Sequence, residues 1–260
     1  MFKVLLKDTF NKQFLIKLYI ILVIFCFFSG QKLSISQLNK LTLPEYVVLM
    51  MSEHYYLIYF MIIAFIFLII GNLKDDNCLL YIRNKHFISY FISKNIVNLI
   101  ISVGFVLIHT SLSFLIGLFK LNLLNEFTTT ASTETMYIYS NYFDTPIFSI
   151  ICLSLYMILG LFFISFIIEF INHFFKKNIT IACVILLYLF MILSLNNRID
   201  NNNFYFLHLN NYFILHHAIV RGQTLSLFLI QFTIITLITL FMKKNWWLKY
   251  SRICKKKVFF

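Results

Sequence analysis

Long apolar blocks separated by short polar segments make up most of the chain. Five blocks are about as long as the ~20 residues that a helix needs to cross a hydrocarbon core of about 30 Å. They cover residues 56–73, 96–119, 147–171, 179–195 and 225–242. A sixth block, residues 18–28, is shorter and crosses only if the Lys17 side chain extends back to the lipid headgroups. The pattern predicts an all-α integral membrane protein, with six transmembrane helices in a single transmembrane domain.

The segment ahead of the first block has a helical repeat of its own. Its apolar residues recur at helical spacing, while lysines and an asparagine occupy the other face. These apolar residues are Phe2, Leu5, Leu6, Phe10 and Phe14. The repeat predicts an amphipathic elbow helix over residues 1–17 that lies along the inner leaflet. A basic anchor without a defined helix explains the same residues equally well.

The first block also has features of a secretory signal. Basic residues precede eleven apolar ones, and Ser29 and Gly30 form a candidate cleavage region. We favour an uncleaved helix. Cleavage would leave the new N-terminus outside, so the other five spans would keep their orientation.

The basic residues alternate with the apolar blocks. Of the 22 lysines and arginines, 17 lie in the N-terminal segment, in residues 74–94, at 176–177 and in the tail 243–260. The intervening segments hold five basic residues and six of the ten acids. This asymmetry predicts that both termini are cytosolic. It also accounts for the net charge of +12 without a nucleic-acid partner.

The expected outer segments, residues 29–55, 120–146 and 196–223, are too short to form a sizeable domain. The third begins with a polar run and continues from residue 204 to 220 as an aromatic, apolar stretch interrupted by Asn210 and Asn211. That mixture predicts an interfacial or re-entrant piece. No cysteine lies in these segments and no C-x-x-C pair exists, which disfavours disulfides, zinc and redox chemistry.

Ionisable residues inside apolar blocks are costly and therefore mark places to look for chemistry. His109 is the deep intramembrane polar candidate, and either a hydrogen bond to a neighbouring helix or a proton relay explains it. Glu169 lies near an interface. No carboxylate pair lies near the bilayer midplane, which disfavours ion-coupled transport.

The outer histidines form a second polar group. His208, His216 and His217 lie near Asp200, but their spacing matches no metal-binding motif, so we expect interfacial polar residues. None of the six glycines belongs to a G-x-x-x-x-G-K-[ST] phosphate cradle. We expect no catalytic residue, no metal and no cofactor bound directly. ATP and magnesium would act through a separate subunit.

The segment over residues 74–94 is the most informative expected cytosolic piece. An acidic start suits a helix N-terminus, and a short amphipathic basic stretch follows it. A partner could bind Asp75, Asp76, Leu79, Leu80, Ile82, Arg83, Lys85 and Phe87. A charged loop that only anchors two spans is an equally good interpretation of this piece alone.

Several of these features together resemble a known family. They are the lying basic helix, the six spans, the stretch Leu79-Leu80-Tyr81-Ile82-Arg83, Lys94 opening the third span, and the membrane-seeking piece before the last span. This layout, over nearly the whole chain, resembles the permease subunit of type-2 ABC exporters. The resemblance implies a coupling helix at about residues 75–87, docked on a cytosolic ATP-binding-cassette ATPase, and a second permease copy or paralogue around a central pathway.

Small members with short outer loops are most similar to transporters of Gram-positive bacteria that export antimicrobial peptides such as bacteriocins, or confer immunity to them. The resemblance therefore implies a multi-pass permease in a bacterial plasma membrane. It would export an amphipathic or apolar peptide or lipid. Two alternatives remain open: a membrane-embedded enzyme or scaffold using His109 or the outer histidines, and an immunity or sensor protein that binds peptide without transport.

Overall fold

The structure, a computed structural model, describes residues 2–38, 40–73, 87–127, 134–196, 206 and 208–257. Every element in these residues is a helix. Six stretches are long and apolar enough to cross a membrane, as predicted; they are Lys12–Gln37, His54–Asn72, Tyr90–Leu118, Pro146–Phe174, Lys177–Ser194 and Thr224–Lys243. The chain is thus an all-helical protein with the properties of a multi-pass membrane protein.

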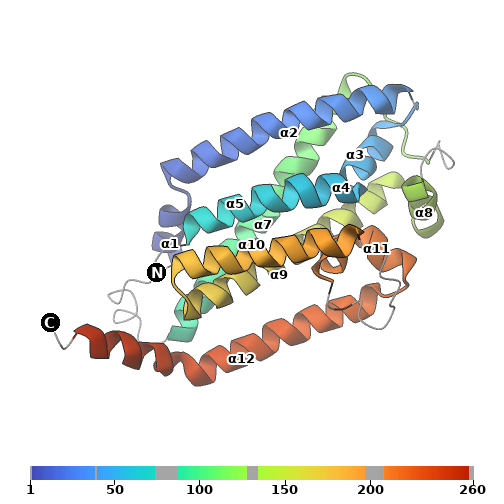
Figure 1. Ribbon diagram of the computed structural model, residues 1–260. Coiled ribbons are helices and arrows are strands. Elements are labelled where there is room, and N and C mark those ends of the chain that lie inside the picture. The colour runs from blue at the N-terminus through green and yellow to red at the C-terminus, as the bar shows by residue number, and fades with distance from the viewer. Residues whose placement is uncertain are drawn as a thin grey trace.

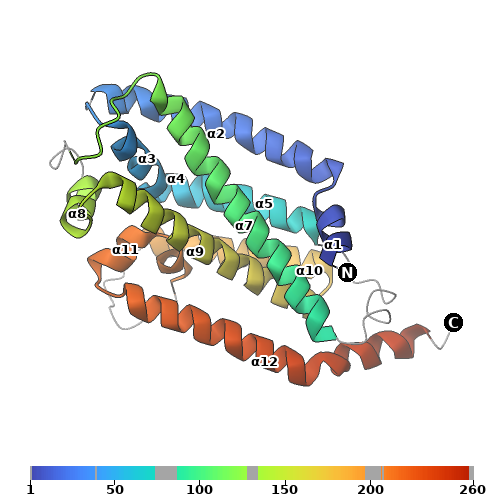
Figure 2. The same cartoon turned by 180° about the vertical axis from the view of Figure 1, so that it is seen from behind.

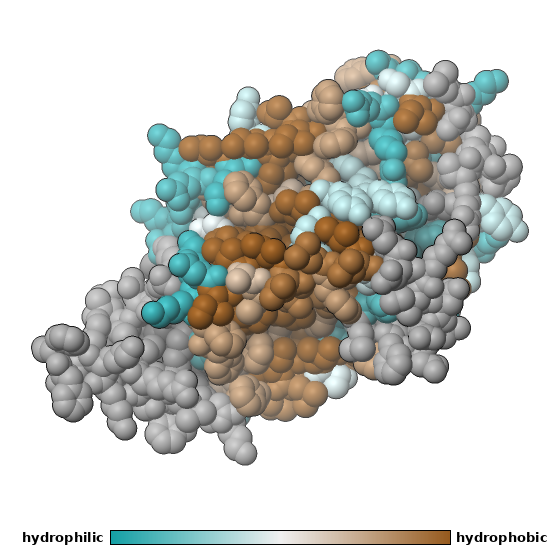
Figure 3. Space-filling model, in the orientation of Figure 1, coloured by the Kyte–Doolittle hydropathy of each residue, from teal (hydrophilic) through white to brown (hydrophobic). Residues whose placement is uncertain are grey.

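The long helices run alongside one another (Figures 1 and 2). They are α2 (Lys12–Leu38), α4 (His54–Tyr56) with the π-helix η1 (Leu57–Ile62) and α5 (Ile63–Asn72), α7 (Phe87–Leu118), α9 (Pro146–Phe174), α10 (Lys177–Asn196) and α12 (Thr224–Lys257). Helix α1 (Phe2–Thr9) and the last turns of α12 lie at one end, which we call the termini end. Helices α3 (Leu43–Ser52), α8 (Glu134–Tyr142) and α11 (Leu215–Val220) lie at the opposite end, called the α8 end. Figure 3 shows an apolar belt between the more hydrophilic ends.

The first span is longer than the apolar block that predicted it. Helix α2 continues past residue 28 because its polar residues find partners. The Tyr46 hydroxyl donates to the Ser29 carbonyl at 2.9 Å, and the two hydroxyls are also 2.9 Å apart. The Ser36 hydroxyl donates a hydrogen bond to the Lys32 carbonyl within the same helix.

Helix α1 ends earlier than the expected range of 1–17. The helix is interrupted between α1 and α2. The Asn11 side-chain oxygen there accepts a hydrogen bond from the Phe14 backbone N–H at 2.9 Å and so caps the start of α2. Helix α1 packs against α7. Its place on an inner leaflet stays a prediction.

Helix α3 is a short helix that we expected only as part of an outer segment. It packs against α7 and α9, and nine of its ten residues are buried. Its start has a capping box, in which Thr42 accepts from the Glu45 backbone and the Glu45 carboxylate accepts from the Thr42 backbone at 2.8 Å. The helix therefore fills the α8 end of the bundle, although it is too short to span.

The segment between α10 and α12 also folds into the bundle. The 3₁₀ helix η3 (Leu209–Tyr212) contacts α9, α10 and α12, and α11 contacts α8, α9 and α12. Asn210 donates to the Met191 carbonyl at 2.7 Å, which ties the segment to α10. The segment is therefore part of the helical bundle, and its interfacial or re-entrant place in a membrane stays a prediction.

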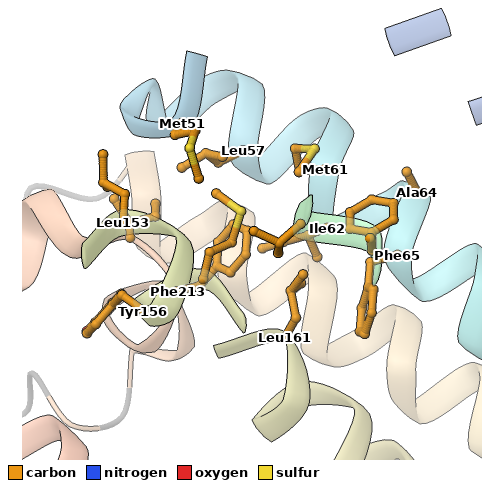
Figure 4. Close-up of a cluster of buried hydrophobic side chains, with 14 of the residues drawn as sticks. Met51, Leu57, Met61, Ile62, Ala64, Phe65, Leu153, Tyr156, Leu161 and Phe213 are labelled. Carbon is orange, nitrogen blue, oxygen red and sulfur yellow. The ribbon is translucent and has the colours of Figure 1, made fainter. Parts of the chain in front are cut away.

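Helix α9 is the central element of the structure. It contacts α3, α5, α7, α8, α10, α11, α12 and η3. Figure 4 shows side chains from α3, η1, α5, α9 and the η3 segment converging in one apolar cluster, among them Met51, Met61, Phe65, Leu153 and Phe213. A movement of α9 would therefore displace side chains on most of the other helices.

Gly160 lets the η3 segment approach α9 backbone to backbone. A Cβ at this position would lie 2.3 Å from the Tyr212 carbonyl oxygen and 2.9 Å from the Phe213 Cα. We expect Gly160→Ala to lower the free energy of unfolding by about 1 to 3 kcal/mol, because backbone atoms must shift. Thermal unfolding in detergent measures the loss.

Gly104→Ala is the matched control for this substitution. Gly104 also lies inside a long helix, but a Cβ there meets nothing within 4 Å. Its variant should unfold at an unchanged or slightly higher temperature, since alanine favours helix over glycine. Equal effects of the two substitutions would contradict the close approach at Gly160.

Candidate functional site

The expected coupling segment lies largely outside the described residues. This applies to Asp75, Asp76, Leu79, Leu80, Ile82, Arg83 and Lys85. Phe87 is the first residue of α7, and its side chain is likewise not described. The structure therefore bears on this segment only through the helix that follows it.

Lys94, about two turns into α7, forms an ion pair with Glu169 of α9. The Lys94 Nζ lies 2.5 Å from the Glu169 Oε1, and the two side chains are only 13% and 7% exposed. The pair joins two antiparallel helices near the termini end. The sequence predicts a position for Glu169 near a membrane interface but does not indicate Lys94 as its partner.

Buried amides follow the two residues of this ion pair along the same two helices. Asn95 and Asn98 follow Lys94 on α7, and Asn172 follows Glu169 on α9; each is at most 6% exposed. Among the described residues, the Asn98 and Asn172 side-chain nitrogens have no hydrogen-bond partner. The ion pair and the amides thus give this end of α7 and α9 several buried polar groups.

His109 lies on α7 and is 3% exposed. Its Nε2 is 3.2 Å from the Tyr56 hydroxyl, and the Phe25 ring packs edge-on at a centroid distance of 4.3 Å. Tyr56 directly precedes the π-helix η1, a helical irregularity that often occurs at functional sites. The hydrogen bond to a neighbouring helix is one of the two interpretations that the sequence left open.

The histidines of the α8 end form a group that includes a residue the sequence analysis did not single out. His54 of α4 stacks at 6.4 Å from His216 and lies 5.8 Å from His217, both on α11. His208 is separate and stacks on Phe190 at 6.5 Å. Asp200 lies outside the described residues.

These histidines are surrounded by other basic groups. Burial, the largest cause, and then the neighbouring His216, His54, Arg221 and His208, in that order, together lower the pKa of His217 to about 4. Burial also lowers the pKa of His208, with a smaller effect from Arg221. His217 is therefore neutral at pH 7 and resists protonation.

The α8 end also contains a groove with a volume of about 390 Å³. It lies between α9 and α12 and is bordered by α8 and α11. Its lining consists of Tyr142, Phe143, Cys152, Leu155, Tyr156, Leu215, Ile219, Gly222, Thr224 and Phe228. The Tyr156 hydroxyl donates to the Asn211 carbonyl, so it is not available to a ligand. The sequence offers no sign of this groove, because four separate elements build it.

No protein-family model matches the chain, and no curated protein or solved structure matches it. In the part of the chain that the structure describes, no three His, Cys, Asp or Glu residues lie close enough to hold a metal ion. Any function must therefore be inferred from the geometry of the chain itself. Three features are candidates: the Lys94–Glu169 ion pair at the termini end, His109 in the middle of the bundle, and the apolar groove at the α8 end.

The Lys94–Glu169 pair should be sensitive to removal of one partner. We expect Glu169→Gln to lower the free energy of unfolding by about 3 kcal/mol, because it leaves a poorly solvated lysine charge. The double variant Lys94→Met/Glu169→Gln should lose less than Glu169→Gln alone. Unfolding titrations in mixed detergent micelles measure this coupling.

Lys32→Met provides the control, since the Lys32–Glu53 pair has the same 2.5 Å separation but side chains that are 29% and 27% exposed. Its loss should stay below about 1 kcal/mol, as for other exposed ion pairs. Additive losses at Lys94 and Glu169 would show that the two charges do not stabilise each other.

Stability should fall as the pH is lowered through the titration range of His217. An unfolded histidine binds a proton near its ordinary pKa of about 6.5, whereas folded His217 stays neutral down to about pH 4. Between these values only the unfolded state gains a proton. We expect a loss of about 1 to 2 kcal/mol, limited by the partial exposure of the ring. His217→Gln should flatten this part of the stability profile, and an unchanged profile would contradict the assignment.

Proposed function

We propose that the chain is the permease subunit of an ATP-binding-cassette exporter of the type-2 class. In this proposal the part of residues 74–94 that precedes α7 lies in the cytosol and binds a separate ATPase subunit. The substrate is an amphipathic or apolar molecule, either a peptide such as a bacteriocin or a lipid. A second permease copy or paralogue completes the pathway in a bacterial plasma membrane.

The contact between Lys94 and Glu169 is the observation that carries this proposal. The expected coupling segment leads directly into α7, and Lys94 connects the start of that helix to α9. Because α9 contacts most other elements, a force applied to residues 74–86 would reach the α8 end through one rigid helix. A buried ion pair transmits such a force better than apolar contacts, since its partners cannot slide without losing a charge contact.

Two further features support the same class. The chain has a separate short helix, α1, packed on α7, the helix that follows the expected coupling segment in the sequence. The segment before the last span, η3 and α11, folds into the bundle at the opposite end. Both features belong to the layout on which the resemblance to type-2 exporters rests.

The alternatives have less support from the geometry. For an enzyme, His109 would need substrate access, but it is enclosed by Phe25 and Tyr56. The histidines at the α8 end face one another rather than the groove lining. An immunity or sensor protein without transport differs from the permease in one respect, the dependence on a partner ATPase.

The ATPase partner gives the decisive experiment. We expect the tagged full-length chain, purified in mild detergent from its own cells, to carry a subunit with Walker motifs and to hydrolyse ATP. The double variant Leu79→Asp/Arg83→Glu should reduce the recovered subunit by about tenfold or more. A tenfold loss requires ~1.4 kcal/mol of binding free energy, and placing the wrong charge in an interface costs more than that.

Lys243→Glu is the matched control, because Lys243 is an exposed basic residue near the termini end but outside the expected coupling segment. It should retain the ATPase subunit. Recovery of a functional chain with no ATPase would refute the proposal and favour the immunity or sensor alternative. Equal losses for both variants would mean that residues 79 and 83 have no specific role.

A further inference from the structure

The groove at the α8 end is large and apolar. Its volume of about 390 Å³ lies within the range of about 300 to 1,000 Å³ that is typical of small-molecule sites. Buried Tyr156, Leu215 and Ile219 are part of its lining. Its other lining residues include three with a polar side-chain group, Tyr142, Thr224 and Cys152.

Water is a poor occupant of this space. A buried water needs two to four polar partners, and apolar cavities of this kind stay dry or take up apolar ligands. The groove reaches Cys152 and Leu155, which lie about 9 to 14 Å along α9 from Pro146 at 1.5 Å per residue. At that depth a hydrocarbon chain is the favourable filling.

The groove is continuous with the lipid-facing side of α9. Leu155 is 57% exposed, and it continues a stripe of exposed apolar residues that includes Phe148 and Ile151. A ligand therefore reaches the groove sideways from the bilayer. This access favours a molecule that already has a chain in the membrane over a peptide arriving from water.

Two residues of opposite charge are sequence neighbours of groove-lining residues at the α8 end. Asp144 follows the lining residue Phe143, and Arg221 precedes the lining residue Gly222; both are exposed. Arginine suits a phosphate group and a carboxylate suits an amine. A headgroup that carries both a phosphate and an amine matches this pair of charges.

We propose that the groove between α9 and α12 binds one acyl chain of a zwitterionic phospholipid, with its headgroup between Asp144 and Arg221. The lipid enters laterally past Leu155, and its chain covers Cys152 and Phe228. This site does not depend on a partner ATPase. It would therefore be present in the purified chain whether or not the chain is a permease.

Photocrosslinking tests this site. The full-length protein is placed in nanodiscs of phosphatidylethanolamine and phosphatidylglycerol that contain phosphatidylethanolamine with a diazirine in one acyl chain. We expect adducts concentrated on Cys152, Leu155 and Phe228. Cys152→Phe should reduce them by about tenfold, because losing the apolar contact of about two methylenes already has that effect.

Cys183→Phe is the matched control, since Cys183 is similarly half-buried but lies on α10, outside the groove lining. It should leave the adducts unchanged. Leu155→Trp, at a position that is already exposed, blocks the mouth without filling the interior and should act like Cys152→Phe even if that variant folds poorly. Adducts spread evenly over α2 and α10, with no effect of either groove variant, would overturn the proposal.

The headgroup contacts have a separate test. Arg221→Gln/Asp144→Asn should lower the yield from the phosphatidylethanolamine probe but not from a diazirine fatty alcohol. If the double substitution changed the adduct yield to the same extent with both probes, or with neither, the headgroup assignment would be overturned. Displacement of the probe by an added hydrophobic peptide, but not by excess phosphatidylethanolamine, would overturn the lipid site in favour of a peptide site.

Discussion

A polar group inside an apolar surrounding must find its partner within the protein, and this requirement sets the positions of the helices. Lys94 is held by Glu169, the Tyr46 hydroxyl by Ser29, and the Asn210 amide by the Met191 carbonyl. Each contact joins two different helical elements. Apolar packing alone allows helices to slide or rotate, because one apolar side chain replaces another at little cost. The few polar contacts therefore select one register among many.

The six long helices could be predicted because about 20 consecutive apolar residues have few other uses in a protein. The short helix α3 could not be predicted from the length of its apolar run, since ten residues cannot span a bilayer. A local signal was nevertheless present: Thr42 and Glu45 form a capping box directly before the apolar run, with Pro44 in its first turn. The extension of α2 could not be predicted in this way, because it depends on Tyr46 reaching Ser29 from another helix.

The candidate site was less predictable than the spans. Glu169 and His109 could be recognised as unusual in an apolar block, and Lys94 only as the basic residue before the third one, but their partners depend on how α7 lies against its neighbours. His54 joins His216 and His217 from a segment more than 150 residues earlier in the chain. No spacing rule within one helix reveals such a group. The groove is even harder to predict from the sequence, because its shape results from the packing of α8, α9, α11 and α12 together.

The helices differ in how tightly the rest of the chain holds them. About half of the apolar stretch of His54–Asn72 and 44% of that of Pro146–Phe174 are buried, against 17% for Lys177–Ser194 and Thr224–Lys243. Helix α12 thus has few internal contacts to lose when it moves, whereas α9 has many. Because the groove lies between these two helices, a displacement of α12 would change its width while α9 and the Lys94–Glu169 contact stay in place. A molecule bound in the groove would favour one position of α12 to the extent that it binds that position more tightly.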